Sequence, residues 1–409
     1  MLYDPARHEP LNPLAWDDAL VRATIDAIAR DARARFSAEK LWPLHPKDFE
    51  PGDDMSQPAL PMYYGAVGTI WALHYLQHVG AIARSQRYDE TLTDVRTHLH
   101  AWLRQLPNDE TASYLMGDTP VLLIQYEADP TPDLTEQLFE LIARNIEHPA
   151  RELMWGSPGT MLAALHLYER SHDARWRELF RRTAERLHSQ LVWSDEVGCH
   201  YWTQDLYGRE SVYLDAVHGF IATAFVLIRG RALLTSEEWE RWEQIIIQTT
   251  QRTAVRESGH ANWPPLLDQV RTTRPSLMQF CHGSPGFVVC LGRFPSSALD
   301  DLLIEAGEAT WAAGPLKKGA NLCHGTGGNG YAFLRLFERT QDERWLDRAR
   351  AFAMHGIQQM RADEREYGQL RYSLWTGDPG FAIYLWDCLQ AKAHFPTLDV
   401  FFAGQPHAR

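Results

Sequence analysis

The sequence predicts an all-α protein in which about seven helical hairpins form a closed toroid. The first observation is a repeated motif, in which a glycine, two further residues and usually a second glycine precede an apolar run. The second is the contrast between these runs, which are apolar nearly throughout, and the amphipathic stretches that separate them. The motif begins at Gly65, Gly117, Gly156, Gly219, Gly283, Gly325 and Gly377, with Pro120 and Ala222 in place of the second glycine in two copies.

The stretches between the motifs are expected to be the outer helices of the hairpins. In one of them, Trp176, Leu179, Phe180, Ala184 and Leu187 recur at intervals of three and four residues among charged neighbours. This spacing defines one buried face and leaves the other face in solvent. The seven expected outer helices span residues 16–36, 89–106, 134–147, 173–193, 237–255, 297–313 and 342–360.

The apolar runs that follow the motifs are expected to be inner helices, enclosed on every side. An open superhelix would need charged residues on its concave face, so the apolar inner helices favour a closed ring. The starts of the inner helices would then face one mouth of the ring, where unpaired N–H groups and positive dipole ends gather. We therefore expect chemistry at this mouth, although close packing is the simpler explanation for the glycines of most copies.

We expect one domain, to which residues 1–60 contribute an outer helix and an irregular loop, and residues 61–409 the seven-repeat barrel. Two connections stand out within it. The Pro-rich and acidic segment 43–61 is typical of a surface loop or lid. The segment 194–208 is typical of a short hairpin, which either overhangs the mouth and selects substrate or is a simple insertion.

Composition argues against several classes of function. Forty Lys and Arg against 53 Asp and Glu give a net charge of −13, and the scattered basic residues do not form a nucleic-acid groove. The sequence contains no apolar run of about 18 residues and therefore predicts no integral membrane segment. The first residues lack the pattern of a secretion signal. Five cysteines are too few for a disulfide framework, which favours the reducing cytoplasm and a catalytic or metal-binding role for any special cysteine.

Two of the motif copies carry a Cys-His pair directly before their first glycine. These pairs are Cys281-His282 in the fifth copy and Cys323-His324 in the sixth. Because equivalent positions of a closed ring lie on one rim, the two sulfurs can converge. Two thiolates and one imidazole, with water in the fourth position, form an open catalytic zinc site. The spacing does not decide which histidine is the third ligand, since both copies contain one.

On these residues, the sequence resembles the lanthionine synthetase C-like family. The resemblance covers all seven repeats, roughly from residue 63 to the end, and its most specific part is LKKGANLCHGTGGNGYAFLRLF. The chain is more similar to the free-standing eukaryotic-type members than to the lantibiotic cyclases. The resemblance implies a ring of seven double helices with one catalytic zinc, held by Cys281, Cys323 and His324, while His282 lies outside the ligand set.

The resemblance also implies a reaction, in which a thiol adds to a dehydroalanine or dehydrobutyrine residue of a peptide or protein and forms a thioether. Zinc lowers the pKa of the thiol and orients its sulfur. The attack leaves an enolate, whose α-carbon needs a proton from a general acid. His218, directly before Gly219, is the candidate acid. Glu152, four residues before Gly156, either orients His218 or caps the helix that follows.

Glutathione is the candidate thiol, because the free-standing members of the family are linked to it. Lys318 matches the glutathione-contacting lysine of the family, and His282 is a further candidate for contact with substrate. A second contact stretch is expected near residues 366–371, where the chain reads EYGQLR and has Glu366 near an expected arginine. This departure leaves the thiol open between glutathione and a peptide cysteine.

Two other functions remain open. One is a non-catalytic module that binds glutathione or a peptide around a structural zinc, which predicts binding without thioether formation. The other is a sugar-processing enzyme, because rings of helical hairpins host such enzymes and aromatic residues near the repeat mouths suit sugar stacking. The chemistry of sugar epimerases and glycosidases, however, needs paired carboxylates or pairs of histidines rather than a Cys-Cys-His rim. The aromatic residues in question are Trp155, Trp202, Trp263 and Trp375.

Overall fold

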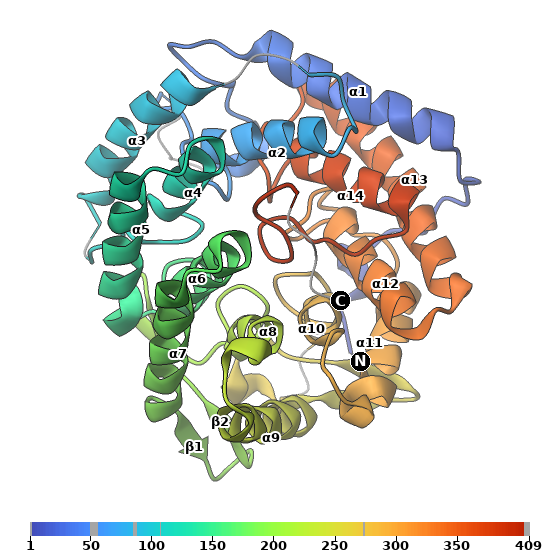
Figure 1. Ribbon diagram of the computed structural model, residues 1–409. Helices are drawn as coiled ribbons and strands as arrows, with labels where there is room; N and C mark the ends of the chain where they lie inside the picture. Colours follow the sequence, from blue (N-terminus) through green and yellow to red (C-terminus); the bar gives the residue numbers. More distant parts are fainter. Residues whose placement is uncertain (1, 50–55, 85–87, 107, 273–274, 405–409) are drawn as a thin grey trace.

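The computed structural model describes residues 2–404 apart from 50–55, 85–87, 107 and 273–274. Within these residues, fourteen α-helices alternate along the chain between an outer and an inner layer (Figure 1). The predicted all-α class and the seven hairpins are confirmed. The outer helices are α1 (Asp18–Arg35), α3 (Asp89–Leu103), α5 (Pro132–Arg144), α7 (Ala174–Ser189), α9 (Ser236–Thr253), α11 (Asp300–Ala313) and α13 (Glu343–Tyr367). The inner helices are α2 (Ala66–His78), α4 (Thr119–Ala128), α6 (Ser157–Ser171), α8 (Phe220–Arg229), α10 (Ser284–Leu291), α12 (Thr326–Thr340) and α14 (Asp378–Gln390).

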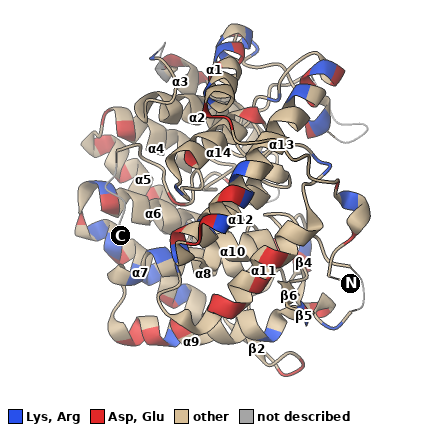
Figure 2. Cartoon of the chain, turned by 90° about the vertical axis from the view of Figure 1, so that its right-hand side faces the viewer, with Lys and Arg blue, Asp and Glu red and all other residues tan. Residues whose placement is uncertain are grey.

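The two layers differ in burial as their sequences predict. Every residue of α10 is buried, and in α8 all residues except Arg229 are buried. By contrast, α7 buries one face, which includes Trp176, Leu179 and Leu187. Figure 2 shows basic and acidic residues interspersed on the outer helices. The apolar all-round helices therefore form the inner wall, and the amphipathic helices separate that wall from solvent.

Backbone hydrogen bonds join the loops that precede the inner helices. The N–H of Tyr63 in the first repeat donates to the carbonyl of Leu115 in the second, at 3.1 Å, and similar bonds join the second repeat to the third and the third to the fourth. In the other direction, Trp375 of the seventh repeat donates to the carbonyl of Tyr63 at 3.0 Å. Cys323 donates to the carbonyl of Trp375 at 2.8 Å, and Cys281 to that of Cys323 at 3.0 Å. The seven loops thus lie side by side in repeat order.

The fourth and fifth repeats are joined by a backbone bond from Leu214 to the carbonyl of Pro265, at 2.9 Å. Their side chains also meet, since Nδ1 of His282 lies 2.8 Å from Oδ2 of Asp215. On the opposite side of the structure, α14 contacts both α1 and α2. The last hairpin therefore packs beside the first, as Figure 1 shows and as the predicted ring requires.

The second glycine of the motif is needed where neighbouring repeats touch. A Cβ atom at Gly159 would lie 2.1 Å from the carbonyl oxygen of Leu153 and 2.6 Å from Cβ of Tyr114 in the preceding repeat. A Cβ atom at Gly286 would likewise lie 2.6 Å from Cβ of Ala216 in the preceding repeat. Because carbon atoms pack at about 3.5–4.0 Å, any side chain at these positions would force adjacent loops apart.

The C-terminal segment, residues 393–404, enters the centre of the ring, where Figure 1 shows it as a red loop. Nε1 of Trp71 on α2 donates to the carbonyl oxygen of Phe401 at 3.0 Å. The hydroxyl of Tyr114 donates to the carbonyl oxygen of Thr397 at 2.5 Å. Because these bonds come from different repeats, this plug segment ties the inner wall together.

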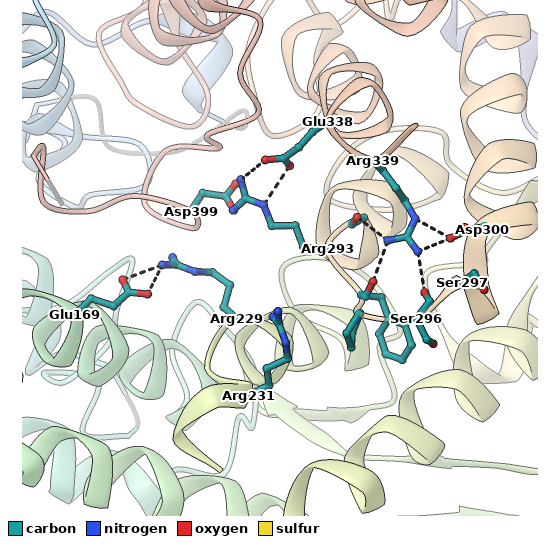
Figure 3. Close-up of a pocket in the computed structure, with 13 residues that line it drawn as sticks. Glu169, Arg229, Arg231, Arg293, Ser296, Ser297, Asp300, Glu338, Arg339 and Asp399 are labelled. Atoms are coloured by element: carbon teal, nitrogen blue, oxygen red, sulfur yellow. Dashed lines mark hydrogen bonds and ion pairs between the residues drawn. The ribbon is translucent and has the colours of Figure 1, made fainter. Parts of the chain in front are cut away.

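A cavity of about 480 Å³ lies at the ends of the inner helices opposite the motif loops, and arginines and carboxylates line it (Figure 3). The buried Arg335 pairs with Asp399 at 2.6 Å, and Arg293 pairs with the same carboxylate at 2.7 Å. Arg229 donates to the carbonyl of Leu398 at 2.6 Å. Since Asp399 and Leu398 belong to the plug segment, this arginine cluster anchors it.

The strands form three short antiparallel hairpins in the connections. The predicted hairpin at 194–208 corresponds to two hairpins, β1 with β2 and β3 with β4. The pairs are β1 (Val192–Ser194) with β2 (Cys199–Tyr201), β3 (Gln204–Leu206) with β4 (Arg209–Ser211), and β5 (Val255–Glu257) with β6 (His260–Asn262).

Some expected boundaries differ from those of the structure. The helix expected at 342–360 continues to Tyr367, because its charged sequence still favours a helix and Gly368 ends it with a φ of 70°. Of the loop expected at 43–61, residues 50–55 lie outside the described part of the chain. The part before them contains a 3-10 turn, Pro46–Asp48. Among the described helices, none is both long and apolar enough to cross a membrane.

Candidate functional site

The loops before α10 and α12 bring the three predicted metal ligands together at the mouth of the ring. The sulfurs of Cys281 and Cys323 and a ring nitrogen of His324 all lie within 4.8 Å of one another. The backbone bond from Cys281 to Cys323 sets this distance, because it pairs equivalent positions of adjacent repeats. In the described part of the chain, no other group of three His, Cys, Asp or Glu side chains converges in this way.

This donor set suits zinc. Tetrahedral bonds of about 2.0–2.3 Å place the ligand atoms roughly 3.5–4 Å apart, which agrees with the observed convergence. Cys281 and Cys323 are buried, whereas His324 is partly exposed, so solvent reaches the cluster from one side. Three protein ligands with access for a fourth are typical of a catalytic zinc site rather than a structural one. The role of these residues as ligands stays a prediction.

Two polar side chains donate hydrogen bonds to the sulfurs. The hydroxyl of Tyr63 lies 2.6 Å from Sγ of Cys323, and Nε2 of Gln279 lies 2.9 Å from Sγ of Cys281. Burial raises the pKa of Cys323, but hydrogen bonds from Cys281 and Tyr63 and the charge of Lys318 outweigh burial and lower it. Burial raises the pKa of Cys281, and the neighbouring sulfur raises it further. Cys323 is thus the more readily ionised thiol of the pair.

His218 is held by Glu152, the carboxylate predicted four residues before Gly156. Nδ1 of His218 lies 2.8 Å from Oε2 of Glu152, whose side chain is fully buried. The same carboxylate accepts the backbone N–H groups of Met154 and Trp155, at 2.9 and 2.5 Å. Glu152 therefore contacts His218 and also binds the loop that leads into α6. It does not cap the helix itself, which begins after Gly156 without a hydrogen bond from a capping side chain.

This contact also sets the protonation of His218. Burial lowers the pKa of His218, but the hydrogen bond and the charge of Glu152 outweigh burial. The charges of Asp215 and Cys281 act in the same direction, so the pKa lies above its ordinary value. A protonated fraction is therefore present near neutral pH. Because Nδ1 is engaged, the proton at Nε2 is the one available to a substrate.

A second carboxylate–imidazole pair, Asp215 with His282, lies beside the first. Asp215 is fully buried, accepts the N–H groups of Val217 and His218 at 2.9 and 2.7 Å, and lies 2.8 Å from Nδ1 of His282. Burial lowers the pKa of His282, but the charges of Asp215 and Cys281 outweigh burial and raise the pKa to about 9. The charge of Asp215 therefore favours the protonated form of His282 next to the cysteine cluster.

Asp215 is not among the residues predicted from the sequence, although the register of the repeats points to it. Counted back from the first glycine of its motif, Asp215 occupies the same fourth position as Glu152. His218, His282 and His324 all stand one residue before the first glycine of their motifs. His218 therefore occupies the repeat position of the other two histidines, not that of the cysteines. Aligning the seven loops residue by residue would have identified both pairs.

The same register accounts for the groups that contact the sulfurs. Tyr63 stands two residues before Gly65, which is the position of Cys281 and Cys323 in their own repeats. Gln279 stands four residues before its glycine, as Glu152 does. Each side chain reaches the cluster because the ring superposes these positions on one rim.

Lys318 lies in a small cleft on the loop before α12, which Arg371 also lines. Nε of Arg371 donates to Oδ1 of Asp48 at 2.7 Å, so the turn Pro46–Asp48 covers this side of the cleft. Glu366, the residue that departs from the family pattern, is exposed near the end of α13 and is not part of the cleft lining. The arginine expected near residue 366 is absent, and Arg371 instead places a positive charge near Lys318.

Comparisons with known proteins concern the family and the fold of the chain. A family model described as lanthionine synthetase C-like protein matches residues 55–400. The chain is 32% identical over 194 residues to glutathione S-transferase LANCL1 of Danio rerio, an alignment that covers 46% of each chain. It is 36% identical over 140 residues to LanC-like protein GCL1 of Arabidopsis thaliana, which covers 31% of each. The matched part thus spans less than half the length of these relatives.

Among solved structures, nisin cyclase superposes with a TM-score of 0.59 and 14% sequence identity, over 90% of this chain and 94% of that one. At this identity the similarity concerns the fold alone. The family match, in contrast, extends over most of the chain and includes every loop of the mouth. The chain belongs to the lanthionine synthetase C-like family.

Proposed function

We propose that the protein is an enzyme that adds a thiol to a dehydroalanine or dehydrobutyrine residue and forms a thioether, with one zinc ion as cofactor. The observation that carries the proposal is the convergence of Cys281, Cys323 and His324 within 4.8 Å, with the His218–Glu152 pair on the adjoining loops. A relative named glutathione S-transferase supports thiol chemistry, and a solved structure named nisin cyclase supports the fold.

The addition forms one C–S bond at the β-carbon and converts the C=C double bond into a single bond. The thiol gives up its proton, the alkene electron pair moves toward the carbonyl as an enolate, and the α-carbon takes up a proton. His218 is the donor of that proton, because Glu152 engages its Nδ1 and keeps its pKa raised. His282, held by Asp215, offers a hydrogen bond to the enolate oxygen.

Cys281, Cys323 and His324 would hold the zinc ion. When bound there, zinc lowers the pKa of a thiol in its fourth position and so provides a thiolate near neutral pH. Tyr63 and Gln279 donate hydrogen bonds to the two cysteine sulfurs and hold them toward the same point. Such contacts fix the orientation of ligands and moderate their negative charge.

Glutathione or a peptide cysteine supplies the thiol in this proposal. Lys318 and Arg371 share a cleft with the carboxylates of Asp363 and Asp378, and the two cations are the candidate contacts for the carboxylates of glutathione. Asp48 pairs with Arg371, so a glutathione carboxylate would take the place of Asp48 there. The five cysteines are free thiols, which suits the reducing cytoplasm that we propose as the compartment.

The geometry disfavours sugar hydrolysis, one form of the sugar-processing alternative. Hydrolysis needs two carboxyl groups that face the substrate from opposite sides. The two carboxylates of the mouth, Glu152 and Asp215, are fully buried, accept backbone N–H groups and lie behind imidazole rings. These carboxylates are placed to orient the histidines and not to contact a sugar.

The proposal is tested by incubating the zinc-loaded protein with glutathione and a dehydroalanine-containing peptide, and following the peptide by mass spectrometry. We expect a peptide that is heavier by one glutathione, formed faster than in the absence of protein. Binding of either compound without adduct above the uncatalysed background, with zinc measured in the protein, would instead support the non-catalytic binding module.

A further inference from the structure

A tyrosine at the tip of a short hairpin projects beside the mouth. Strands β3 and β4 pair with Leu206 opposite Arg209, so Tyr207 and Gly208 form a two-residue turn. The side chain of Tyr207 is 74% exposed, which makes it the most exposed large hydrophobic residue in the described part of the chain. A ring so exposed adds little to the core of the protein.

The backbone at this tip is unfavourable for a tyrosine. Tyr207 has a φ of 55° and Gly208 a φ of 71°, the pattern of a type I′ turn with positive φ at both central residues. Asn and Gly favour that conformation, whereas a bulky side chain is strained in it. Strain of this kind gathers at ligand-binding sites, where the side chain is needed for another purpose.

The hairpin is fastened to the loop that carries Glu152. Arg151, directly before Glu152, donates from Nη1 to the carbonyl of Thr203 at 2.8 Å. The N–H of Asp205 donates to the carbonyl of Pro149 at 3.3 Å. Arg151 itself has a φ of 48°, so the two segments meet at a second strained residue. The position of the hairpin tip is therefore tied to that of the catalytic carboxylate.

Contacts connect the tip to the proposed proton donor. Nε1 of Trp155 donates to the hydroxyl of Tyr207 at 3.2 Å, and the two rings meet edge to face with centroids 6.3 Å apart. The backbone N–H of Trp155 is in turn bound by Glu152, which holds His218. The centroid of the Trp155 ring also lies 6.4 Å from that of Trp102. Tyr207 is thus linked through Trp155 to Glu152, the residue that holds His218.

We propose that Tyr207 is a positioning residue, which holds the unsaturated acceptor against His218. This inference rests on the proposed function and adds a residue that binds its acceptor. The exposed ring face of Tyr207 packs against the chain that flanks the dehydroamino acid, and its O–H donates to a peptide carbonyl.

The test substitutes Tyr207→Asn, because asparagine suits the positive φ better than tyrosine does. We expect the melting temperature to stay the same or rise, since the strained turn is relieved. The KM for a dehydroalanine peptide rises about 5- to 10-fold while kcat changes little, because an aromatic contact is lost. Tyr207→Phe keeps the ring and shows a smaller rise. Trp193→Ala, which removes an exposed ring from β1 at the outer rim (Figure 1), leaves KM unchanged.

Two outcomes separate this inference from the proposed function. If the wild-type protein forms the glutathione adduct and Tyr207→Asn has the same KM, the positioning role is wrong and the proposed function stands. If the wild-type protein forms no adduct, the proposed function fails, and fluorescence anisotropy with a labelled dehydroalanine peptide tests the contact by itself. Equal affinity of wild-type and Tyr207→Asn protein in that measurement also overturns the inference.

Discussion

The mouth of the ring and its opposite end both hold buried ionisable side chains, but they hold them in different ways. At the opposite end, Arg335 and Arg293 both pair with Asp399. Burial raises the pKa of Asp399, but the arginine charges outweigh burial and lower it to about 2. The charged form of Asp399 is therefore favoured far below neutral pH, and the two arginines anchor the plug segment through it. Figure 3 shows Arg293 and Asp399 of this cluster.

At the mouth, the ionisable groups are imidazoles and thiols. The pKa of His218 is raised above its ordinary value and that of His282 to about 9, whereas the pKa of Cys323 is lowered. Imidazoles and thiols ordinarily titrate closer to neutral pH than arginines or carboxylates do, so they are better suited to exchange protons with a substrate. The comparison shows that one repeat architecture provides a permanently charged end, which stabilises the fold, and an end whose charges change, which suits proton transfer.

Removal of one cysteine sulfur from the mouth is expected to have the largest effect on activity, and so tests the difference between the two ends most strongly. Cys323→Ala is expected to lower the rate of adduct formation about 10³-fold or more, since the donor set for zinc is incomplete. Far-UV circular dichroism should remain that of the wild-type protein. Cys290→Ala removes a thiol that is packed within α10 and serves as the control, with zinc content and rate unchanged. Equal rates for the two variants would contradict the assignment of the cluster.

The acid pair offers the next largest effect. His218→Asn is expected to lower kcat by roughly 10²- to 10⁴-fold, because the enolate loses its proton donor. Glu152→Gln keeps one of the two oxygens that accept backbone N–H groups and should lower kcat less, while reducing the pKa of His218. Steady-state kinetics with the dehydroalanine peptide measure both. A change confined to KM in His218→Asn would show that His218 binds substrate without donating the proton.

The opposite end should respond in stability rather than in activity. Arg335→Met leaves Asp399 with one partner fewer in a buried network, and we expect unfolding to become easier by about 3–5 kcal/mol. The rate per folded molecule should stay at the wild-type level, because the cluster lies away from the mouth. Urea unfolding, monitored by tryptophan fluorescence, measures the change in the free energy of unfolding. A loss of activity at unchanged stability would mean that the two ends are not separate in function.

The smallest expected effect concerns pH and the Asp215–His282 pair. Because the folded pKa of His282 is raised to about 9, the pair contributes its full stability below the ordinary pKa of about 6.5 and loses it as the pH rises through about 9. Asp215→Asn should therefore lower the melting temperature more at pH 6 than at pH 10. An NMR titration should show the pKa of His282 falling in this variant. The same loss of stability at both pH values would contradict the charge interaction.

The repeat pattern was sufficient to predict the hairpins and the mouth. Glycines before apolar runs indicated where inner helices begin, since Gly159 and Gly286 are needed for close contact between loops. The course of the plug segment was not predictable, because it depends on contacts of Trp71 and Tyr114 with residues some 300 positions away. Local periodicity carries no information about such contacts.

The candidate site was predicted in part for the same reason. Cys281 and Cys323 share a repeat position, so their proximity follows from the ring. Asp215 and Tyr63 were missed, although they occupy repeat positions that were already of interest in other copies. The contact of Tyr207 with Trp155 depends on the placement of a hairpin between repeats, which the repeat register does not determine.

The zinc content of the full-length protein, purified without chelators, tests the central claim most directly. Plasma emission spectrometry should find about one zinc per chain in the wild-type protein and in Cys290→Ala, and almost none in Cys323→Ala. A folded wild-type protein that holds no zinc, even after dialysis against the metal and removal of the excess, would contradict the account of the mouth as a metal centre.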